Sequence, residues 1–343
     1  MKLFLRINVS AIGIAVSLLA GLSLAEANEP REWTNTDGVT ITAKMLGVDD
    51  QGKVLMLFKG EETPVPLDTL SEADQEYVAQ WQVKQKELEK QRAAQATMFA
   101  GKQLKLGGEK NMFEFDYEPE VLQAVKDKYK SEDTGYRIAI TVPEDFDSRK
   151  PQKVFFLANA QNSKAQSRMG NVLAIHNFNK TTAAEGWVCI AYDSNLGNDV
   201  NHTVAWSAAM HKLVSEWPDF NNWIFACGGN SGGAKGAMIH TAYHVSRERK
   251  VVGLFLSSCN QATNMTYARD RYDVNKSDLR DTRCYASANK TTNKVTPANM
   301  SDVLSTIKGE GVRTVRDEWH EGAPGIYQEH FAEALRWFTQ ENP

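Results

Sequence analysis

The sequence has few of the residues that would place it in a specialised structural class. Four cysteines in 343 residues are too few for a disulfide scaffold, and no C-x-x-C pair is present to indicate a zinc or redox site. Lys and Arg number 39 against 43 Asp and Glu, so the net charge of −4 lacks the basic excess of a nucleic-acid-binding protein. We therefore expect no metal, no cofactor and no nucleic-acid partner.

The shares of 42% hydrophobic and 24% charged residues are those of an ordinary globular chain. They exclude wholesale disorder, and a chain of this length is expected to form roughly two domains.

The first 27 residues are typical of an export signal. A basic start is followed by an apolar stretch from 7 to 24 and by the small-residue pattern Ala-Glu-Ala at 25–27. Asn8 and Ser10 interrupt the apolar stretch, which is short for a membrane span, so we favour cleavage after Ala27 over an uncleaved anchor. The sequence thus predicts an exported protein, periplasmic or secreted, with no stable membrane span after cleavage.

Residues 28–82 have the pattern of a small antiparallel barrel. Short runs of alternating apolar and polar residues are separated by glycine-containing turns, which is typical of consecutive hairpins. The runs are 39–43, 54–58 and 63–67. Ser71 then precedes an acidic first turn, so we expect a closing helix from Glu72 to Trp81.

This segment resembles the first Sla homology domain, which is an SH3-like barrel. The resemblance is carried by REWTNTDG at its start and by VPLDTLSEADQEYVAQW at its end, with the motif LS-x-x-D-x-x-Y-V. It implies a binding or scaffolding module, with a protein or cell-envelope ligand, rather than a catalyst. No ligand-binding residue can be carried over.

Residues 83–130 are expected to form a charged helical linker. The stretch 82–100 is rich in Gln, Lys, Glu and Ala and contains neither Gly nor Pro, which predicts a solvated helix or spacer. A helix that binds a specific partner is the alternative.

From residue 131 to the end, the pattern changes to short apolar runs without polar alternation. Such runs are buried on both faces of a sheet, and amphipathic stretches long enough for crossover helices lie between them. The apolar runs are 136–142, 154–158, 187–191, 223–227 and 251–258, and the helical stretches include 204–217 and 234–245. The sequence therefore predicts an α/β domain with a parallel sheet and helices on both faces.

Two cysteines fall at the ends of strands that this arrangement makes neighbours. Cys227 and Cys259 could pair, because export permits disulfides. Two buried free thiols are the alternative, and the sequence leaves both open.

A serine flanked by glycines follows the buried run 223–227. Gly229-Asn-Ser231-Gly-Gly233 fits G-x-S-x-G between a strand and a helix. A sharp turn there strains the serine backbone, and the flanking residues must be glycine because a side chain would collide with a neighbouring element. The hydroxyl is then exposed near a helix N-terminus, whose amides favour developing negative charge. We predict Ser231 as a nucleophile and the Gly232 N–H as the first oxyanion donor.

A hydrolase of this kind needs a base that comes later in the chain. The pattern predicts a last strand over 312–318 and a last helix over 326–340, with His320 in the loop between them. From that loop an imidazole could reach Ser231 and take its proton. His330 lies inside the predicted helix and is the weaker candidate.

A second pair of histidines has the spacing of a metal site. His240 and His244 are four residues apart on one predicted helix, but Thr241 replaces the glutamate of H-E-x-x-H. We therefore expect packing or surface roles for both histidines.

Residues 136–338 resemble an α/β-hydrolase, most of all the exported esterases and depolymerases. The resemblance supports the nucleophile, the base and the first oxyanion donor already named. It also implies a second donor after the strand 154–158, where such enzymes often have His-Gly. This sequence has Ala160 and Gln161 there, and either backbone N–H could serve.

The acid of the family's triad has no obvious counterpart. The family places it after the seventh strand, and the corresponding stretch 284–297 contains no Asp or Glu. Thr292 or Asn293 occupies the approximate position and could orient an imidazole, but neither could stabilise its cation as a carboxylate does. The other acid position, after the sixth strand, begins Cys259-Asn-Gln261 and is also uncharged. The polar insertion 261–281 that follows is either a wall of the pocket or a surface loop.

These inferences predict an exported two-module protein whose larger module hydrolyses an ester through Ser231 and His320 without a cofactor. Export and the resemblance favour a polysaccharide-linked or polymeric ester as substrate, although peptide hydrolysis is possible on the same fold. The rival is a catalytically impaired hydrolase-like protein that binds or scaffolds. The missing acid favours the rival, and the joint presence of the serine, its glycines and the histidine favours the enzyme.

Overall fold

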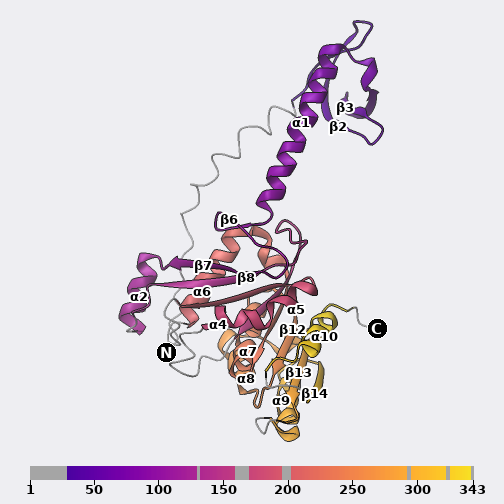
Figure 1. Ribbon diagram of the computed structural model, residues 1–343. Helices are drawn as coiled ribbons and strands as arrows, with labels where there is room; N and C mark the ends of the chain where they lie inside the picture. The colour runs from indigo at the N-terminus through magenta and orange to yellow at the C-terminus, as the bar shows by residue number, and fades with distance from the viewer. Residues whose placement is uncertain are drawn as a thin grey trace. The chain divides into compact units, whose positions relative to one another are not determined.

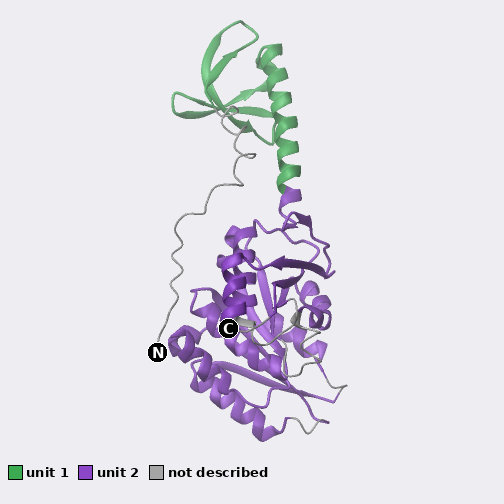
Figure 2. Ribbon diagram, turned by 90° about the vertical axis from the view of Figure 1, so that its left-hand side faces the viewer, with its two compact units in different colours: residues 1–92 green, residues 93–343 purple. Residues whose placement is uncertain are grey.

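The chain divides into two compact units, residues 1–92 and 93–343, seen in a computed structural model (Figures 1 and 2). The structure describes residues 29–129, 132–158, 170–194, 202–291, 295–321 and 325–340. The expected export signal, 1–27, lies outside the described residues. Within the described part of the chain, no helix is both long enough and apolar enough to cross a membrane.

The first unit contains a small antiparallel sheet and the beginning of a long helix. The strands are β1 (Arg31–Thr34), β2 (Thr40–Val48), β3 (Lys53–Phe58) and β4 (Glu61–Pro66), paired in that order. Their inward residues bury Trp33, Val54 and Met56 in a core of their own, because alternate side chains of a strand share one face. The three apolar runs that the sequence predicts as strands are therefore confirmed as part of an antiparallel sheet. The SH3-like assignment stays a prediction.

The helix α1 (Glu72–Gln95) joins two segments that the sequence separates into a closing helix and a spacer. Only Asp74 and Val78 are buried along it. Asp74 accepts hydrogen bonds from Arg31 Nη2 (2.6 Å) and from the backbone N–H of Thr34 (2.7 Å), which fixes the first turn to β1. The rest of the helix is solvated, as its composition predicts.

The second unit is built on an eight-stranded sheet in the order β14-β13-β12-β11-β9-β10-β8-β7. The strands are β7 (Asn111–Asp116), β8 (Gly135–Thr141), β9 (Lys153–Ala158), β10 (Val188–Ser194), β11 (Ile224–Asn230), β12 (Lys250–Ser257), β13 (Arg283–Asn289) and β14 (Thr314–His320). β8 is antiparallel to both of its neighbours, β10 and β7, and the six strands from β9 to β14 are parallel to one another. The predicted parallel sheet is confirmed, with an antiparallel pair added at one edge.

The strand β7 corrects the expectation of a helical linker over 83–130. After α1 the chain forms a short ribbon, β5 (Met98–Phe99) with β6 (Lys102–Gln103), then β7, then α2 (Pro119–Tyr129). Residues 111–116 read Asn-Met-Phe-Glu-Phe-Asp, an alternation that suits an edge strand with one buried face. The charged composition of the surrounding segment favours a helix, but pairing with β8 makes residues 111–116 a strand.

Helices cover both faces of the large sheet (Figure 1). They are α4 (Gly170–Ala174), α5 (Asn179–Ala184), α6 (His202–Glu216), α7 (Gly232–Val245), α8 (Thr263–Tyr272), α9 (Pro297–Gly309) and α10 (Gln328–Phe338). One core includes Trp206 of α6, Met265 of α8 and Met300 of α9, and the other includes Phe331 of α10. A large, mostly parallel sheet between two helical layers is the α/β architecture that the sequence predicts.

The structure bears on two alternatives that the sequence leaves open. The cysteines are all buried free thiols, so Cys227 and Cys259 do not pair. The insertion 261–281 is not a simple loop, because it contains α8, whose Met265 and Ala268 are buried in the core.

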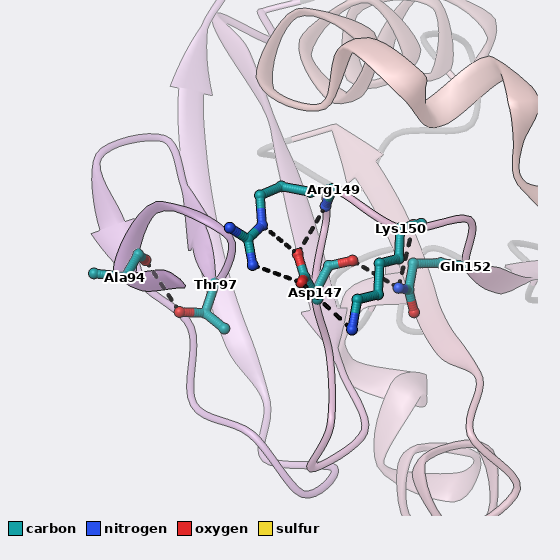
Figure 3. Close-up of polar contacts among 6 residues, drawn as sticks. All are labelled: Ala94, Thr97, Asp147, Arg149, Lys150 and Gln152. Carbon is teal, nitrogen blue, oxygen red and sulfur yellow. Dashed lines mark hydrogen bonds and ion pairs between the residues drawn. The ribbon is translucent and has the colours of Figure 1, made fainter. Parts of the chain in front are cut away.

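The loop leading into β9 is fixed by one buried carboxylate (Figure 3). Asp147 accepts hydrogen bonds from Arg149 Nε (2.9 Å) and Nη2 (2.8 Å), and its backbone carbonyl accepts one from Gln152 Nε2 (2.7 Å). The hydrogen bonds from Arg149 lower the pKa of Asp147 to about 2. This cluster lies where β9 begins, so it anchors a central strand at the end opposite to the site described next.

Candidate functional site

Ser231 occupies the turn between β11 and α7 in a strained backbone conformation. Its φ is 55° and its ψ is −115°, and its side chain is exposed. A residue with a side chain held in such a sparsely populated region costs about 1–3 kcal/mol. The structure thus has the strained strand-to-helix turn that G-x-S-x-G predicts. Gly232 is the first residue of α7, where helix N–H groups have no intrahelical acceptor.

The two glycines at the end of β11 are explained by close packing against neighbouring elements. A Cβ atom on Gly229 would lie 2.2 Å from the carbonyl oxygen of Ala158 and 2.6 Å from the carbonyl carbon of Gly233. One on Gly228 would lie 2.5 Å from Cζ of Phe155. β9 and α7 approach the elbow so closely that a side chain at either position would displace one of them.

We expect the Ser231→Gly variant to be more stable than the wild type. Glycine would release the backbone strain of the folded state, which stabilises the protein by about 1–3 kcal/mol. Glycine also makes the unfolded chain more flexible, which lowers the stability by about 0.5–1 kcal/mol. The net free energy of unfolding should rise by about 1 kcal/mol, measured by urea denaturation. Ser231→Ala is the matched control, because it removes the hydroxyl but keeps the strain. Equal stability of the two variants would contradict the prediction.

Backbone hydrogen bonds link the carboxyl ends of four neighbouring strands. The N–H of Ser231 donates to the carbonyl of Ser257 at the end of β12 (2.8 Å). Likewise Ser258 N–H donates to the Ser287 carbonyl in β13 (2.7 Å), and Lys290 N–H donates to the His320 carbonyl in β14 (2.8 Å). We call these three bonds the carboxyl-edge ladder. It fixes the backbone of the serine to the strand that carries the histidine.

The histidine itself lies in the last strand, and not in the loop after it as the sequence predicts. His320 is the last residue of β14 and lies in register with Asn289 of β13. β12 and β13 separate β14 from β11, so three strand spacings of about 4.8 Å lie between those two strands. The structure places Ser231 and His320 at the same edge of the sheet, but no hydrogen bond joins them.

The ring of His320 is enclosed by aromatic side chains. It is 5% exposed, stacks on Tyr327 with ring centres 4.6 Å apart, and meets His330 edge-on at 5.6 Å. Neither ring nitrogen has a hydrogen-bond partner among the described residues. Burial, together with the nearby His330, lowers the pKa of His320, so the imidazole is neutral at pH 7. Neutral imidazole is the form that can accept a proton.

His330, set aside by the sequence as a helical residue, lies behind this ring. A hydrogen bond of 3.0 Å joins its Nδ1 to Oγ of Ser287. Burial lowers the pKa of His330 as well. The sequence offers one signal for this arrangement, since the first turns of α10 directly follow the loop after His320. His330 therefore helps to define the environment of the candidate base.

The segment after β14 returns toward the elbow. Oγ of Ser257 donates to Oδ1 of Asn230 (3.1 Å), the residue before the serine, and also approaches the carbonyl of Gly325 (3.4 Å). Gly325 follows His320 by five residues in the sequence, so this contact places the residue where the described chain resumes beside the end of β12.

Four of the predicted site residues lie outside the described residues. They are the second oxyanion candidates Ala160 and Gln161 and the candidates for the third triad member, Thr292 and Asn293. Asn289, at the end of β13, is a buried polar residue near that position which the sequence does not single out. Its Oδ1 accepts hydrogen bonds of 2.6 Å from both N and Oγ1 of Thr291.

The other pair of histidines has a packing role, as predicted. His240 Nε2 is joined to the Tyr192 hydroxyl (2.7 Å), and His244 stacks on Phe225 with ring centres 4.9 Å apart. Burial lowers the pKa of His244 well below its usual value, so it stays neutral. Across the part of the chain that the structure describes, no group of three His, Cys, Asp or Glu residues is arranged to hold a metal ion.

A buried ion pair at the end of β10 is absent from the predictions. Asp193 accepts a hydrogen bond from Arg137 Nε (2.8 Å), and burial outweighs this pairing and raises the pKa of Asp193 to about 6. The sequence signal is weak, because Asp193 continues an apolar run. The pair links β10 to β8 and lies in strands beyond β9, away from β12 to β14.

No protein-family model and no curated protein sequence matches the chain. Three solved structures illustrate its likeness to known folds. The Bacillus cereus carboxylesterase is 11% identical, with 64% of this chain and 98% of that chain covered and a TM-score of 0.38. The S-formylglutathione hydrolase from Agrobacterium tumefaciens is 15% identical, with 70% and 98% covered and a TM-score of 0.44. The Pyrococcus furiosus esterase is 11% identical, with 62% and 93% covered and a TM-score of 0.39.

Proposed function

We propose that this protein is a serine hydrolase that cleaves an ester with Ser231 as its nucleophile. The observation that carries the proposal is the strained, exposed serine at the start of α7, preceded by glycines that the packing requires. A binding protein has no need to keep a nucleophile in a conformation that costs folding energy. The helix N-terminus supplies N–H groups where negative charge develops on the substrate.

The proposed reaction proceeds in two acyl-transfer steps. The Ser231 hydroxyl attacks the ester carbonyl while an imidazole takes its proton, and the Gly232 N–H donates to the oxyanion. The C–O bond then breaks, the proton goes to the leaving alcohol, and an acyl-enzyme remains. Water attacks this ester in the same way and releases the carboxylic acid. His320 is the proposed base because it is neutral and lies at the same sheet edge, and its ring must move toward the serine when substrate binds.

The substrate class and the setting are also part of the proposal. The apparent signal at 1–27 supports export to the periplasm or the medium, where esters of polysaccharides and polyesters are accessible. The first unit would then act as the SH3-like binding module that its motif resembles. Neither role requires a cofactor.

Covalent labelling tests the nucleophile without knowledge of the substrate. We expect a fluorophosphonate probe to label the mature wild-type protein on the peptide that contains Ser231, and to leave Ser231→Ala unlabelled. Ser258→Ala is the matched control, because Ser258 follows the next strand and also has a positive φ of 50°. Mass spectrometry of the labelled peptide measures both. Equal labelling of Ser231→Ala would contradict the proposal.

A catalytically impaired binding protein is the second candidate. It is favoured by one observation: neither nitrogen of His320 has a partner among the described residues, so no described carboxylate orients the ring. Wild-type protein that stays unlabelled between pH 5 and pH 9 would support this candidate.

A further inference from the structure

An open groove lies between α9 and the outer strand β14, on the sheet face opposite to α10. Its volume is about 410 Å³, within the range of about 300–1,000 Å³ typical of small-molecule sites. One face of α9 lines it with Met300, Leu304 and Lys308, spaced four residues apart, and β14 lines it with Asp317 and Trp319. Nothing in the proposed reaction uses these residues.

The groove combines an apolar floor with a polar rim. Met300, Leu304 and the indole of Trp319 supply the apolar surface, and Ser301 and Ser305 supply hydroxyl groups. The rim carries one cation and one anion, Lys308 and Asp317, so the groove has no net charge to attract a strongly charged ligand. The Trp319 indole N–H donates to Asp317 Oδ2 (3.2 Å), which holds the carboxylate beside the ring. A ligand that fits is neutral, with one apolar face and hydrogen-bonding groups at its edges.

A sugar ring has this chemistry. Its C–H face can pack on an indole, and its hydroxyl groups can donate to a carboxylate and exchange hydrogen bonds with serine and lysine. β14 is the last strand of the sheet, so the groove is open along its outer side and a ligand longer than one ring can extend beyond it. Trp319 directly precedes His320 in β14, and because successive strand residues point to opposite faces, the groove and the candidate base lie on opposite faces of the sheet at the same carboxyl end of the strand.

We propose that this groove binds a sugar unit of a neutral polysaccharide. The claim that the groove binds a sugar rests on the groove alone. The further claim that this sugar belongs to the substrate rests on the proposed ester hydrolysis, because the polymer would then lie beside the carboxyl edge where its ester would react.

An extended peptide is the competing occupant, because β14 is an edge strand that could pair with another strand. The charged residues Arg316, Asp317 and Glu318 are consecutive in β14, and such charges protect edge strands from pairing. The groove also presents side-chain hydroxyl and carboxylate groups rather than a row of backbone groups. These features favour the sugar.

Affinity electrophoresis of the full chain tests the inference independently of catalysis. Native gels are cast with xylan, galactomannan or hydroxyethylcellulose, and migration is compared with that in a gel without polysaccharide. We expect at least one polysaccharide to retard the wild type, and Trp319→Ala to weaken the apparent affinity about tenfold, since loss of an aromatic anchor often costs this much. Ser305→Leu changes an exposed helical position and fills the groove, so it should weaken binding without removing core packing. Tyr267→Ala is the matched control, because Tyr267 is an aromatic residue 54% exposed on α8 and outside the groove.

The possible outcomes distinguish a failure of the sugar-binding inference from a failure of the proposed ester hydrolysis. Retardation that is lost in both groove variants and kept in Tyr267→Ala supports the inference, whether or not the fluorophosphonate labels Ser231. Labelling of Ser231 without retardation in any of the three polysaccharides overturns the inference and leaves the hydrolase intact. Retardation that both groove variants retain, or a groove that proves to bind a peptide instead, also overturns it.

Discussion

Gly229→Ala is expected to destabilise the second unit by about 3 kcal/mol or more, which for many proteins is enough to prevent accumulation of folded chain. The new methyl group would lie 2.2 Å from the carbonyl oxygen of Ala158 and 2.6 Å from the backbone of Gly233. Both contacts are with main chain, so no side-chain rotation can relieve them. Either β9 or α7 must shift, and both are packed in the core.

Denaturant unfolding of the purified variant measures this loss, with fluorophosphonate labelling as a second readout. Gly309→Ala is the matched control. Gly309 ends α9 with no atom within 4 Å of the position of a new Cβ, and its φ is not in the left-handed region. That substitution should be neutral or stabilise by about 0.5 kcal/mol, because alanine restricts the unfolded chain. A Gly229→Ala protein as stable as this control would show that the elbow is less tightly packed than described.

His320→Gln is expected to lower the rate of labelling at Ser231 by about 100- to 10,000-fold, the range for loss of a general base. Glutamine keeps a planar polar group of similar length, so the enclosed site beside Tyr327 stays filled. His211→Ala is the matched control, because His211 is an exposed histidine on α6. Thermal unfolding of both variants separates a catalytic loss from a folding defect.

The pH dependence of labelling gives a sharper test of the same role. Only neutral imidazole accepts the serine proton, and the pKa of His320 is lowered by burial and by His330. The wild-type rate should therefore stay level on acidification to about pH 6.5, the ordinary histidine value, and fall only below it. The residual rate of His320→Gln should lack this decline. A wild-type profile that falls well above pH 6.5 would assign the base to another group.

The elbow could be predicted from the sequence because its constraints are local. A buried strand, the glycines around Ser231 and the start of a helix all lie within about fifteen residues, and the glycines before the serine have a steric reason in the packing. The central strands were equally accessible, since runs such as 154–158 and 251–258 have no polar alternation.

The position of the histidine could not be predicted in the same way. Pairing with β13 extends β14 to His320 and keeps it in register with Asn289, and such a register depends on residues far away in the sequence. The strand β7 was missed for a related reason, because it is stable only as the partner of β8. The groove could not be predicted from the sequence either, because its two walls, α9 and β14, come together only in the folded chain.

The carboxyl-edge ladder has a consequence for how such a protein could change over evolution. It holds Ser231, Ser258 and Lys290 to their neighbouring strands through N–H and carbonyl groups that every residue except proline supplies. Apart from the glycines before the serine, side chains along this edge can therefore be exchanged without breaking these backbone hydrogen bonds. New substrate preferences could arise by single substitutions around a nucleophile whose placement is inherited unchanged.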